Sequence, residues 1–166
     1  LDVGGGSGIY TLAFLKKAPH MTATLFDLPQ VIEIARERLA EHGLLERVKL
    51  VAGDYTKDEL PPGHDLTLLS AIIHSNSRES NQKLYAAVFR CLEPGGIILI
   101  RDHIMNESRT EPVDGAIFAV NMLAATRAGD TYTWSEVRED LEKAGFHDVR
   151  IIREGEHMDQ LVIGTK

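Results

Sequence analysis

The chain opens on Leu1-Asp2-Val3-Gly4-Gly5-Gly6-Ser7-Gly8, in which glycines recur at alternate positions after an acidic residue. A helical pattern over Ile9–Lys17 follows, so the run predicts a sharp turn from a strand into a helix. Glycine has no Cβ atom, and the backbone of such a turn can come unusually close to a ligand. A glycine-rich turn can also serve packing alone, so other residues must decide between binding and packing.

Apolar β-rich runs alternate with helical patterns along the chain, which is typical of a parallel sheet covered on both faces. The expected strands are Leu1–Val3, Thr22–Phe26, Val48–Val51, Leu66–Ile73, Gly96–Ile100, Val149–Arg153 and Gln160–Gly164. The expected helices are Ile9–Lys17, Pro29–His42, one between an Asn76/Glu79 capping box and Pro94, Val113–Thr126 and Ser135–Ala144. We predict an α/β fold, a Rossmann-like, doubly wound sheet of seven mostly parallel strands with a C-terminal antiparallel hairpin.

Composition limits the function classes. A chain of 166 residues with 43% hydrophobic content is expected to form one domain, residues 1–166. The net charge of −7 comes without a basic stripe, which argues against a nucleic-acid partner. No apolar run reaches the ~20 residues of a membrane span, and the expected location is cytoplasmic. Since only Leu1 and Val3 precede the glycines, we expect a piece of a longer polypeptide that begins inside a strand.

Two further acidic residues favour a binding site. Asp27 ends the second expected strand, where a carboxylate can accept hydrogen bonds from a ribose diol; its alternative role is to cap the next helix. Asp54 follows the third strand, where it could accept from an adenine amino group while Tyr55 flanks the ring; its alternative role is that of a turn aspartate. Strand ends at the carboxyl edge of one sheet predict an adenosine site.

The glycine spacing separates two cofactor classes. The dinucleotide fingerprint requires Gly-x-Gly-x-x-Gly, and the last position of that frame is Ile9 here. The run instead reads Asp2-x-Gly4-x-Gly6-x-Gly8, a form that resembles the glycine loop of class I methyltransferases. That resemblance implies that Asp2 organises the loop around a methionine ammonium group. A nicotinamide-dependent oxidoreductase is therefore disfavoured but stays an alternative.

With these residues in place, the chain resembles the catalytic domain of class I, S-adenosylmethionine-dependent small-molecule O-methyltransferases related to caffeate, hydroxyindole and bacterial polyketide enzymes. The shared pieces are Leu1–Gly8, Phe26–Pro29, Gly53-Asp54, Leu69–His74, Leu92–Gly96, Ile100–Asp102 and Ala144–Phe146. The resemblance implies methyl transfer to a small-molecule acceptor, with S-adenosylhomocysteine as the product. It implies that the cofactor is lined by Gly4, Gly6, Asp27, Leu28, Asp54, Tyr55 and Ser70, and that His74 is the general base.

The chain also departs from the family's pattern. Ser75-Asn76 follows the histidine where the family usually has Asp-Trp, and Asp102 stands where many members carry a glutamate that supports the histidine. A second such acid is replaced near Thr131. The resemblance further implies a preceding dimerisation domain and hence a homodimer. Some relatives methylate carbon and a few have lost methyl transfer, so a C-methyltransferase and a non-catalytic cofactor-binding module stay open.

The acceptor chemistry points to a histidine. A phenol with a pKa of ~10 must lose its proton, and an imidazole with a pKa near ~6.5 can accept it. His74 is expected to serve as this base with Asp102 beside it. His103 could face the acceptor, and Asn121 and Met122 could border the acceptor pocket. Asp102-His103 and Glu107 do not form a metal cluster, because no further ligand completes a set at a usual spacing. No metal is therefore expected.

Overall fold

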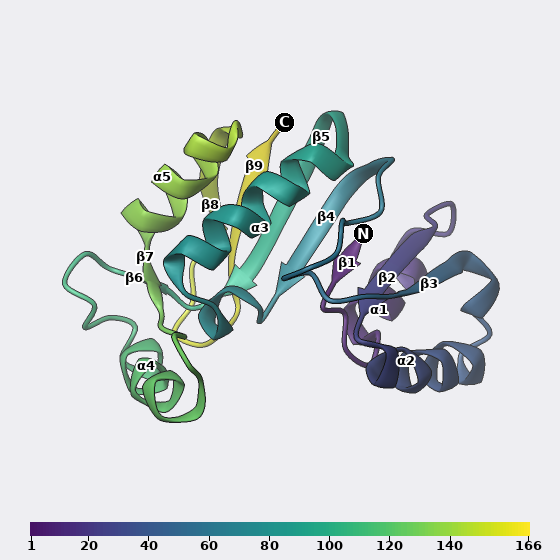
Figure 1. Ribbon diagram of the computed structural model, residues 1–166, viewed down its shortest axis with the longest axis horizontal. Helices are drawn as coiled ribbons and strands as arrows, with labels where there is room; N and C mark the ends of the chain where they lie inside the picture. Colours follow the sequence, from purple (N-terminus) through teal and green to yellow (C-terminus); the bar gives the residue numbers. More distant parts are fainter. The chain divides into compact units, whose positions relative to one another are not determined.

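The computed structural model describes all residues from 1 to 166, and the chain forms two compact units, Leu1–Pro61 and Pro62–Lys166 (Figure 1). Each unit combines strands with helices. No helix has both the length and the apolar character that a membrane crossing requires. The expectation of a single domain stays a prediction, and the two units are described separately below.

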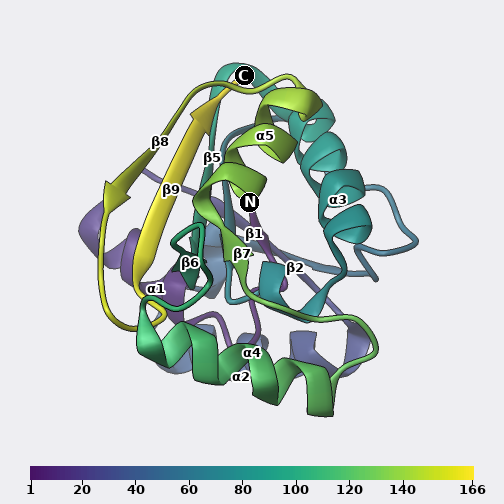
Figure 2. The same ribbon diagram turned by 90° about the vertical axis from the view of Figure 1, so that its left-hand side faces the viewer.

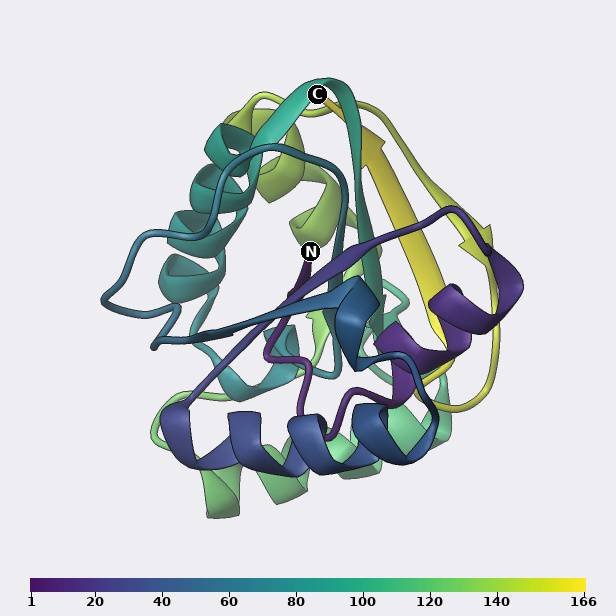
Figure 3. The same cartoon turned by 90° about the vertical axis from the view of Figure 1, so that its right-hand side faces the viewer.

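The first unit is a three-stranded parallel sheet in the order β3-β2-β1, and Figure 3 faces it, in purple and blue. Its elements are β1 (Asp2–Val3), α1 (Ile9–Lys17), β2 (Ala23–Asp27), α2 (Pro29–Glu41), η1 (Leu45–Arg47) and β3 (Val48–Ala52). Leu25 of β2 packs in a core with Leu15 of α1 and Leu39 of α2. The Arg47 guanidinium donates to Ala18 O at 2.7 Å, after the last residue of α1. This packing holds α1 and α2 against β2.

The second unit is a four-stranded sheet in the order β4-β5-β9-β8, in which β4 and β5 are parallel and β9 is antiparallel to both neighbours. Its elements are β4 (His64–Ser70), η2 (Ile73–Ser75), α3 (Arg78–Cys91), β5 (Leu92–Asp102), β6 (Ile104–Met105), α4 (Val113–Ala125), β7 (Tyr132–Thr133), α5 (Trp134–Ala144), β8 (His147–Arg153) and β9 (Gln160–Thr165). Helices α3 and α5 lie side by side over the strands, whereas α4 lies apart from them (Figures 1 and 2).

The α/β class, the seven expected strands and the antiparallel C-terminal pair are confirmed. Three details differ from the expectation. The fourth strand ends at Ser70, not Ile73, because the chain turns at Ala71 and forms the 3₁₀ turn η2. The two-residue strands β6 and β7 pair as a separate small sheet. The cap of α3 is not Asn76 with Glu79: Ser77 accepts from the backbone N–H of Ser80, because the 3₁₀ turn extends to Ser75 and delays the start of α3.

Candidate functional site

The glycine turn between β1 and α1 has the geometry expected of a close-approach loop. Gly4, Gly6 and Gly8 have φ angles of 65°, 57° and 74°, in the region that glycine adopts without strain. Gly5 was not among the predicted site residues, although it lies inside the motif. A Cβ atom there would lie 2.7 Å from Leu25 Cγ and 2.9 Å from Asp2 Cγ. The turn therefore has no room for a side chain at this position.

Asp2 lies buried beneath this turn. Its carboxylate accepts a hydrogen bond of 2.6 Å from Thr11 Oγ1 of α1, and burial raises the pKa of Asp2 above its ordinary value. The side chain thereby joins the end of β1 to the first turns of α1. Its expected role near a methionine ammonium group stays a prediction.

Asp27 holds the turn from the neighbouring strand. Its two carboxylate oxygens accept hydrogen bonds of 2.7 Å each, one from Gly6 N and one from Leu28 N. Helix α2 has no side-chain cap, so Asp27 does not have the capping role that was its alternative. A carboxylate has about four acceptor positions, which leaves capacity for a diol. The side chain of Leu28 is 38% exposed and offers an apolar surface beside this carboxylate.

Asp54 follows β3 and organises its own turn. Its carboxylate accepts from Thr56 N at 2.9 Å and from Thr56 Oγ1 and Lys57 Nζ at 2.6 Å each. These hydrogen bonds, that from Lys57 above all, lower the pKa of Asp54 to about 2. The carboxylate is thus ionised at neutral pH and can only accept hydrogen bonds. The expected adenine contacts of Asp54 and of half-buried Tyr55 stay predictions.

In the second unit, His74 lies on η2, three residues beyond the turn that ends β4. Ala71 makes that turn with a φ of 58°, and its N–H donates to Arg101 O at 2.9 Å, which ties the turn to β5. Ser70, the last residue of β4, accepts from Arg101 Nη1 at 3.3 Å. The expected contact of Ser70 with a cofactor stays a prediction.

His74 and Asp102 form a buried pair, with side chains 10% and 1% exposed. The imidazole Nδ1 lies 2.9 Å from Asp102 Oδ1 and 3.0 Å from Oδ2. Asp102 Oδ1 also accepts from His103 N at 2.8 Å, which fixes the carboxylate. Because a carboxylate only accepts, Nδ1 carries the proton and Nε2 is left with a lone pair. The ring packs edge-on against Phe118 of α4, with the centroids 4.8 Å apart.

A cavity of about 250 Å³ lies beside this pair and is lined by His103, Asp114, Ile117, Phe118, Asn121 and Met158. Two predicted acceptor residues, His103 and Asn121, therefore line one cavity, whereas Met122 does not. His103 is 5% exposed, its Nδ1 has no hydrogen-bond partner, and burial lowers its pKa. The cavity thus combines the apolar side chains of Ile117, Phe118 and Met158 with the polar side chains of His103, Asp114 and Asn121.

The family model for an O-methyltransferase domain matches residues 1–147. The chain belongs to this O-methyltransferase family. It is 38% identical to the 3-hydroxy-5-methyl-1-naphthoate 3-O-methyltransferase of Streptomyces sahachiroi over 92% of its length and 44% of that protein. The structure of an O-methyltransferase family 2 protein from Planctomyces limnophilus in complex with apigenin is 35% identical, with a TM-score of 0.91. The alignment with that structure covers 99% of this chain and 49% of the other.

Human N-acetylserotonin methyltransferase in complex with SAM is also similar, at 27% identity and a TM-score of 0.88 over 99% of this chain and 46% of that one. The O-methyltransferase domain described here therefore spans about half the length of the relatives it matches. The resemblance drawn from its motifs is confirmed at the level of the family. That assignment also counts against the nicotinamide-dependent alternative.

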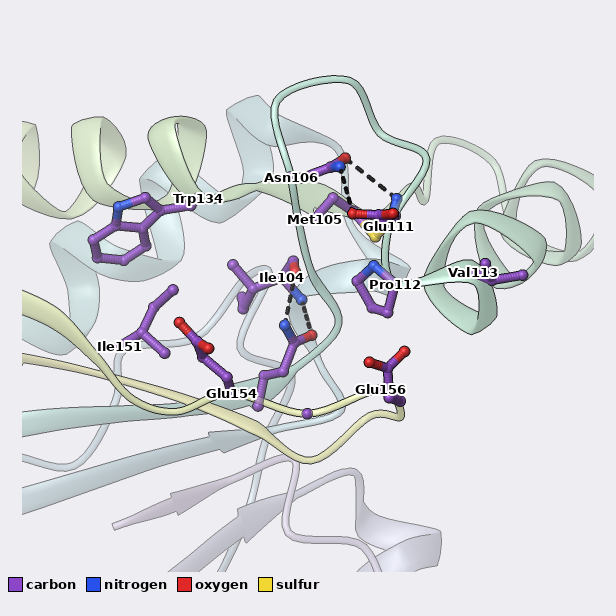
Figure 4. Close-up of a pocket in the computed structure, with 12 residues that line it drawn as sticks. Ile104, Met105, Asn106, Glu111, Pro112, Val113, Trp134, Ile151, Glu154 and Glu156 are labelled. Carbon is purple, nitrogen blue, oxygen red and sulfur yellow. Dashed lines mark hydrogen bonds between the residues drawn. The ribbon is translucent and has the colours of Figure 1, made fainter.

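The sequence of this O-methyltransferase domain gave no sign of a second, larger cavity of about 800 Å³ (Figure 4). Trp134 and Ile151 line it, as do Glu154 and Glu156. Gln160 also lines it and pairs with the backbone of Ile104 through hydrogen bonds of 2.7 and 2.9 Å. Short strands and loops distant in sequence form this cavity, so no local pattern could reveal it. Nowhere in the chain are three His, Cys, Asp or Glu residues grouped to hold a metal ion.

Proposed function

We propose that the chain is the catalytic domain of an S-adenosylmethionine-dependent methyltransferase that acts on a hydroxyl group of a small aromatic or polyketide-like compound. The observation that carries the proposal is the buried His74–Asp102 pair, which leaves one imidazole nitrogen able to accept a proton. One similar protein is named as the 3-O-methyltransferase of a naphthoate, and the structure of another is a complex with apigenin. S-Adenosylmethionine supplies a sulfonium-bound methyl group when it is bound, and S-adenosylhomocysteine is the product.

The residues of the first unit fit such a cofactor. The glycine turn excludes a Cβ atom at Gly5, and Asp27 holds that turn while it keeps acceptor capacity for a ribose diol. Exposed Leu28 can cover one side of an adenine ring. The proposed cofactor residues of this unit are Asp2, Gly4, Gly6, Asp27, Leu28, Asp54 and Tyr55. Ser70, in the second unit, is also a proposed cofactor residue.

The residues of the second unit serve the acceptor. His74 Nε2 would accept the hydroxyl proton as the acceptor oxygen takes the methyl group, and bound S-adenosylmethionine would leave as S-adenosylhomocysteine. Asp102 stabilises the imidazolium that forms and keeps the ring oriented. His103 and Asn121 offer polar contacts in the cavity beside Phe118. Met122 follows Asn121 on α4, outside the lining of that cavity, and is kept as a proposed acceptor residue. These three are the proposed acceptor-binding residues.

The test is His74→Ala in the full-length protein. Loss of a general base costs ~10²–10⁴-fold in rate, so kcat should fall by that order. The affinity for S-adenosylhomocysteine, measured by calorimetric titration, should stay unchanged because the imidazole serves the acceptor. His147→Ala, at an exposed histidine in β8, is the matched control. An unchanged kcat in a folded His74→Ala protein would contradict the proposed base and favour His103 or transfer to carbon.

We also infer that the parent polypeptide is a cytoplasmic homodimer formed through a further domain. The support is the length of the relatives, about twice that of this chain. A second support is α4, whose side chains Val113, Ile117, Val120 and Leu123 are 59–81% exposed. Large apolar side chains gathered on one helix mark an interaction surface.

A further inference from the structure

The turn that carries His74 is short, and Ser75-Asn76 follows the histidine. A single 3₁₀ turn has weak internal hydrogen-bond geometry, and Ile73–Ser75 is three residues long. Something outside the turn must therefore keep the imidazole in one place.

Asn81 of α3 provides the first contact. Its side chain is 1% exposed, and its Nδ2 donates to Ile73 O at 2.8 Å, the carbonyl immediately before His74. Its Oδ1 accepts from Asn76 Nδ2 at 3.0 Å, so one buried amide clamps both ends of the turn. Neither contact involves the Asp102 side of the imidazole.

Tyr132 of β7, far from the turn in sequence, provides the second contact. Its hydroxyl donates to Asn76 O, and burial raises the pKa of Tyr132 to about 12, so the phenol keeps this proton at neutral pH. The adjoining loop completes the clamp. Asp130 N donates to His74 O at 3.0 Å, and a Cβ atom at Gly129 would lie 2.4 Å from that oxygen.

We propose that Asn76, Asn81 and Tyr132 form a positioning network that holds His74 against Asp102. All three side chains are buried. Asn81 and Tyr132 donate to the backbone carbonyls of Ile73 and Asn76, and the Asn76 amide donates to Asn81 Oδ1. None of the three is among the residues proposed to bind the acceptor or the cofactor. Its effect on rate rests on the proposed function, whereas its effect on the His74–Asp102 hydrogen bond does not.

The test uses two variants of the full-length protein. Asn81→Asp keeps the size and Oδ1 but loses the donor to Ile73 O, and Tyr132→Phe removes only the hydroxyl. Gln82→Glu is the matched control, an equivalent amide-to-acid change at the next residue of α3, where Nε2 donates to Asp140 instead. The first readout is the NMR resonance of the His74 Nδ1 proton, which Asp102 protects from exchange in the parent protein. The second readout is kcat against KM for S-adenosylmethionine.

In Asn81→Asp and Tyr132→Phe, the Nδ1 resonance should broaden or disappear. Displacement of a reacting group by ~1 Å costs up to ~10²-fold, so kcat should fall roughly 10- to 100-fold while KM for S-adenosylmethionine stays constant. Gln82→Glu should change neither readout. If Asn81→Asp does not fold, Tyr132→Phe decides alone. A sharp Nδ1 resonance in a folded variant overturns the network, whereas absent turnover in the parent protein overturns only the proposed function.

Discussion

Asp27 shows how one side chain can serve structure and binding together. Its carboxylate fixes Gly6 and Leu28 through two charge-assisted hydrogen bonds, and these are worth more than bonds between neutral groups. Because the same oxygens retain acceptor capacity, a ligand that binds there meets a group already oriented. In the proposed cofactor site, this carboxylate therefore contributes to affinity both directly and through the shape of the turn.

Asp27→Ala should weaken S-adenosylhomocysteine binding by ~100-fold or more. The variant loses the two proposed hydrogen bonds from the ribose diol to the carboxylate, and at ~1.5 kcal/mol each these amount to that factor. Calorimetric titration measures the change. Glu37→Ala, which removes an exposed carboxylate from α2 of the same unit, is the control and should bind normally. An Asp27→Ala protein that is folded and binds with parent affinity would exclude Asp27 from the cofactor site.

Gly5 is constrained by contact and not by its φ angle. Because a Cβ atom would meet Leu25 Cγ at 2.7 Å, Gly5→Ala should lower the free energy of unfolding by about 1–3 kcal/mol through overpacking. Urea denaturation of Gly5→Ala, Leu25→Ala and the double variant forms a cycle. The double variant should lose less than the sum of the single losses; strict additivity would show that the clash is not with Leu25.

Local sequence patterns predicted the site residues that lie within single motifs. They did not predict contacts between residues that are distant in sequence. Asp27 followed from its place at the end of an apolar run, and the pairing of His74 with Asp102 followed from the family resemblance. The contact of Tyr132 with Asn76 joins residues 56 positions apart through two elements of two or three residues. Such short elements carry no periodicity, so the sequence could not predict this support.

At the scale of elements, the end of β4 shows why an apolar run can mislead. Leu66–Ile73 is continuously compatible with a buried strand, yet the ladder with β5 ends at Ser70. Ala71 takes a left-handed φ of 58°, which a non-glycine residue adopts only at a cost of about 1–2 kcal/mol. Ile73 is still buried, in a 3₁₀ turn instead of a strand. The apolar run therefore reports that Ile73 is buried, but it does not show that the backbone leaves the strand after Ser70.

The loop between β8 and β9 is joined to α4 by His157, whose Nδ1 lies 2.5 Å from Asp114 Oδ2. This hydrogen bond raises the pKa of His157 above its ordinary value. A raised pKa means that the contact with Asp114 favours protonated His157. The contribution of this contact to the stability of the folded loop is therefore complete below the ordinary histidine pKa of ~6.5. It is lost as pH rises through the raised pKa of His157.

The loop should accordingly open more as pH rises through that range. Trypsin cleavage after Arg153, normalised to an unstructured peptide of the same sequence, should accelerate with pH in the parent protein. His157→Gln should remove this pH dependence, because the glutamine cannot be charged. His147→Gln, at an exposed histidine outside the loop, should retain it. A parent protein with the same normalised cleavage rate at every pH would contradict the role of the pair.

At the scale of the whole molecule, the exposed apolar side of α4 is the surface that a further domain of the parent polypeptide could cover. Val120 and Leu123 are 65% and 81% exposed, and Phe118 of the same helix packs against His74. A domain that covered α4 would bury its outer side and fix its inner side against the base. The comparisons add that similar proteins are about twice as long as this chain.

The last prediction concerns residues 1–166 expressed alone. Since the cofactor residues and the His74–Asp102 pair lie within the chain, the isolated domain should bind S-adenosylhomocysteine. Because the outer side of α4 would be uncovered, the domain should turn over at least ~10-fold more slowly than its parent polypeptide, as expected when a positioned group loses its support.

Sedimentation should give a dimer for the parent and a different state for the fragment. Leu123→Lys should disturb the parent's turnover and leave the fragment's unchanged, since its partner surface is present only in the parent. A monomeric fragment with full activity would show that α4 needs no covering domain, and that its apolar side serves another partner.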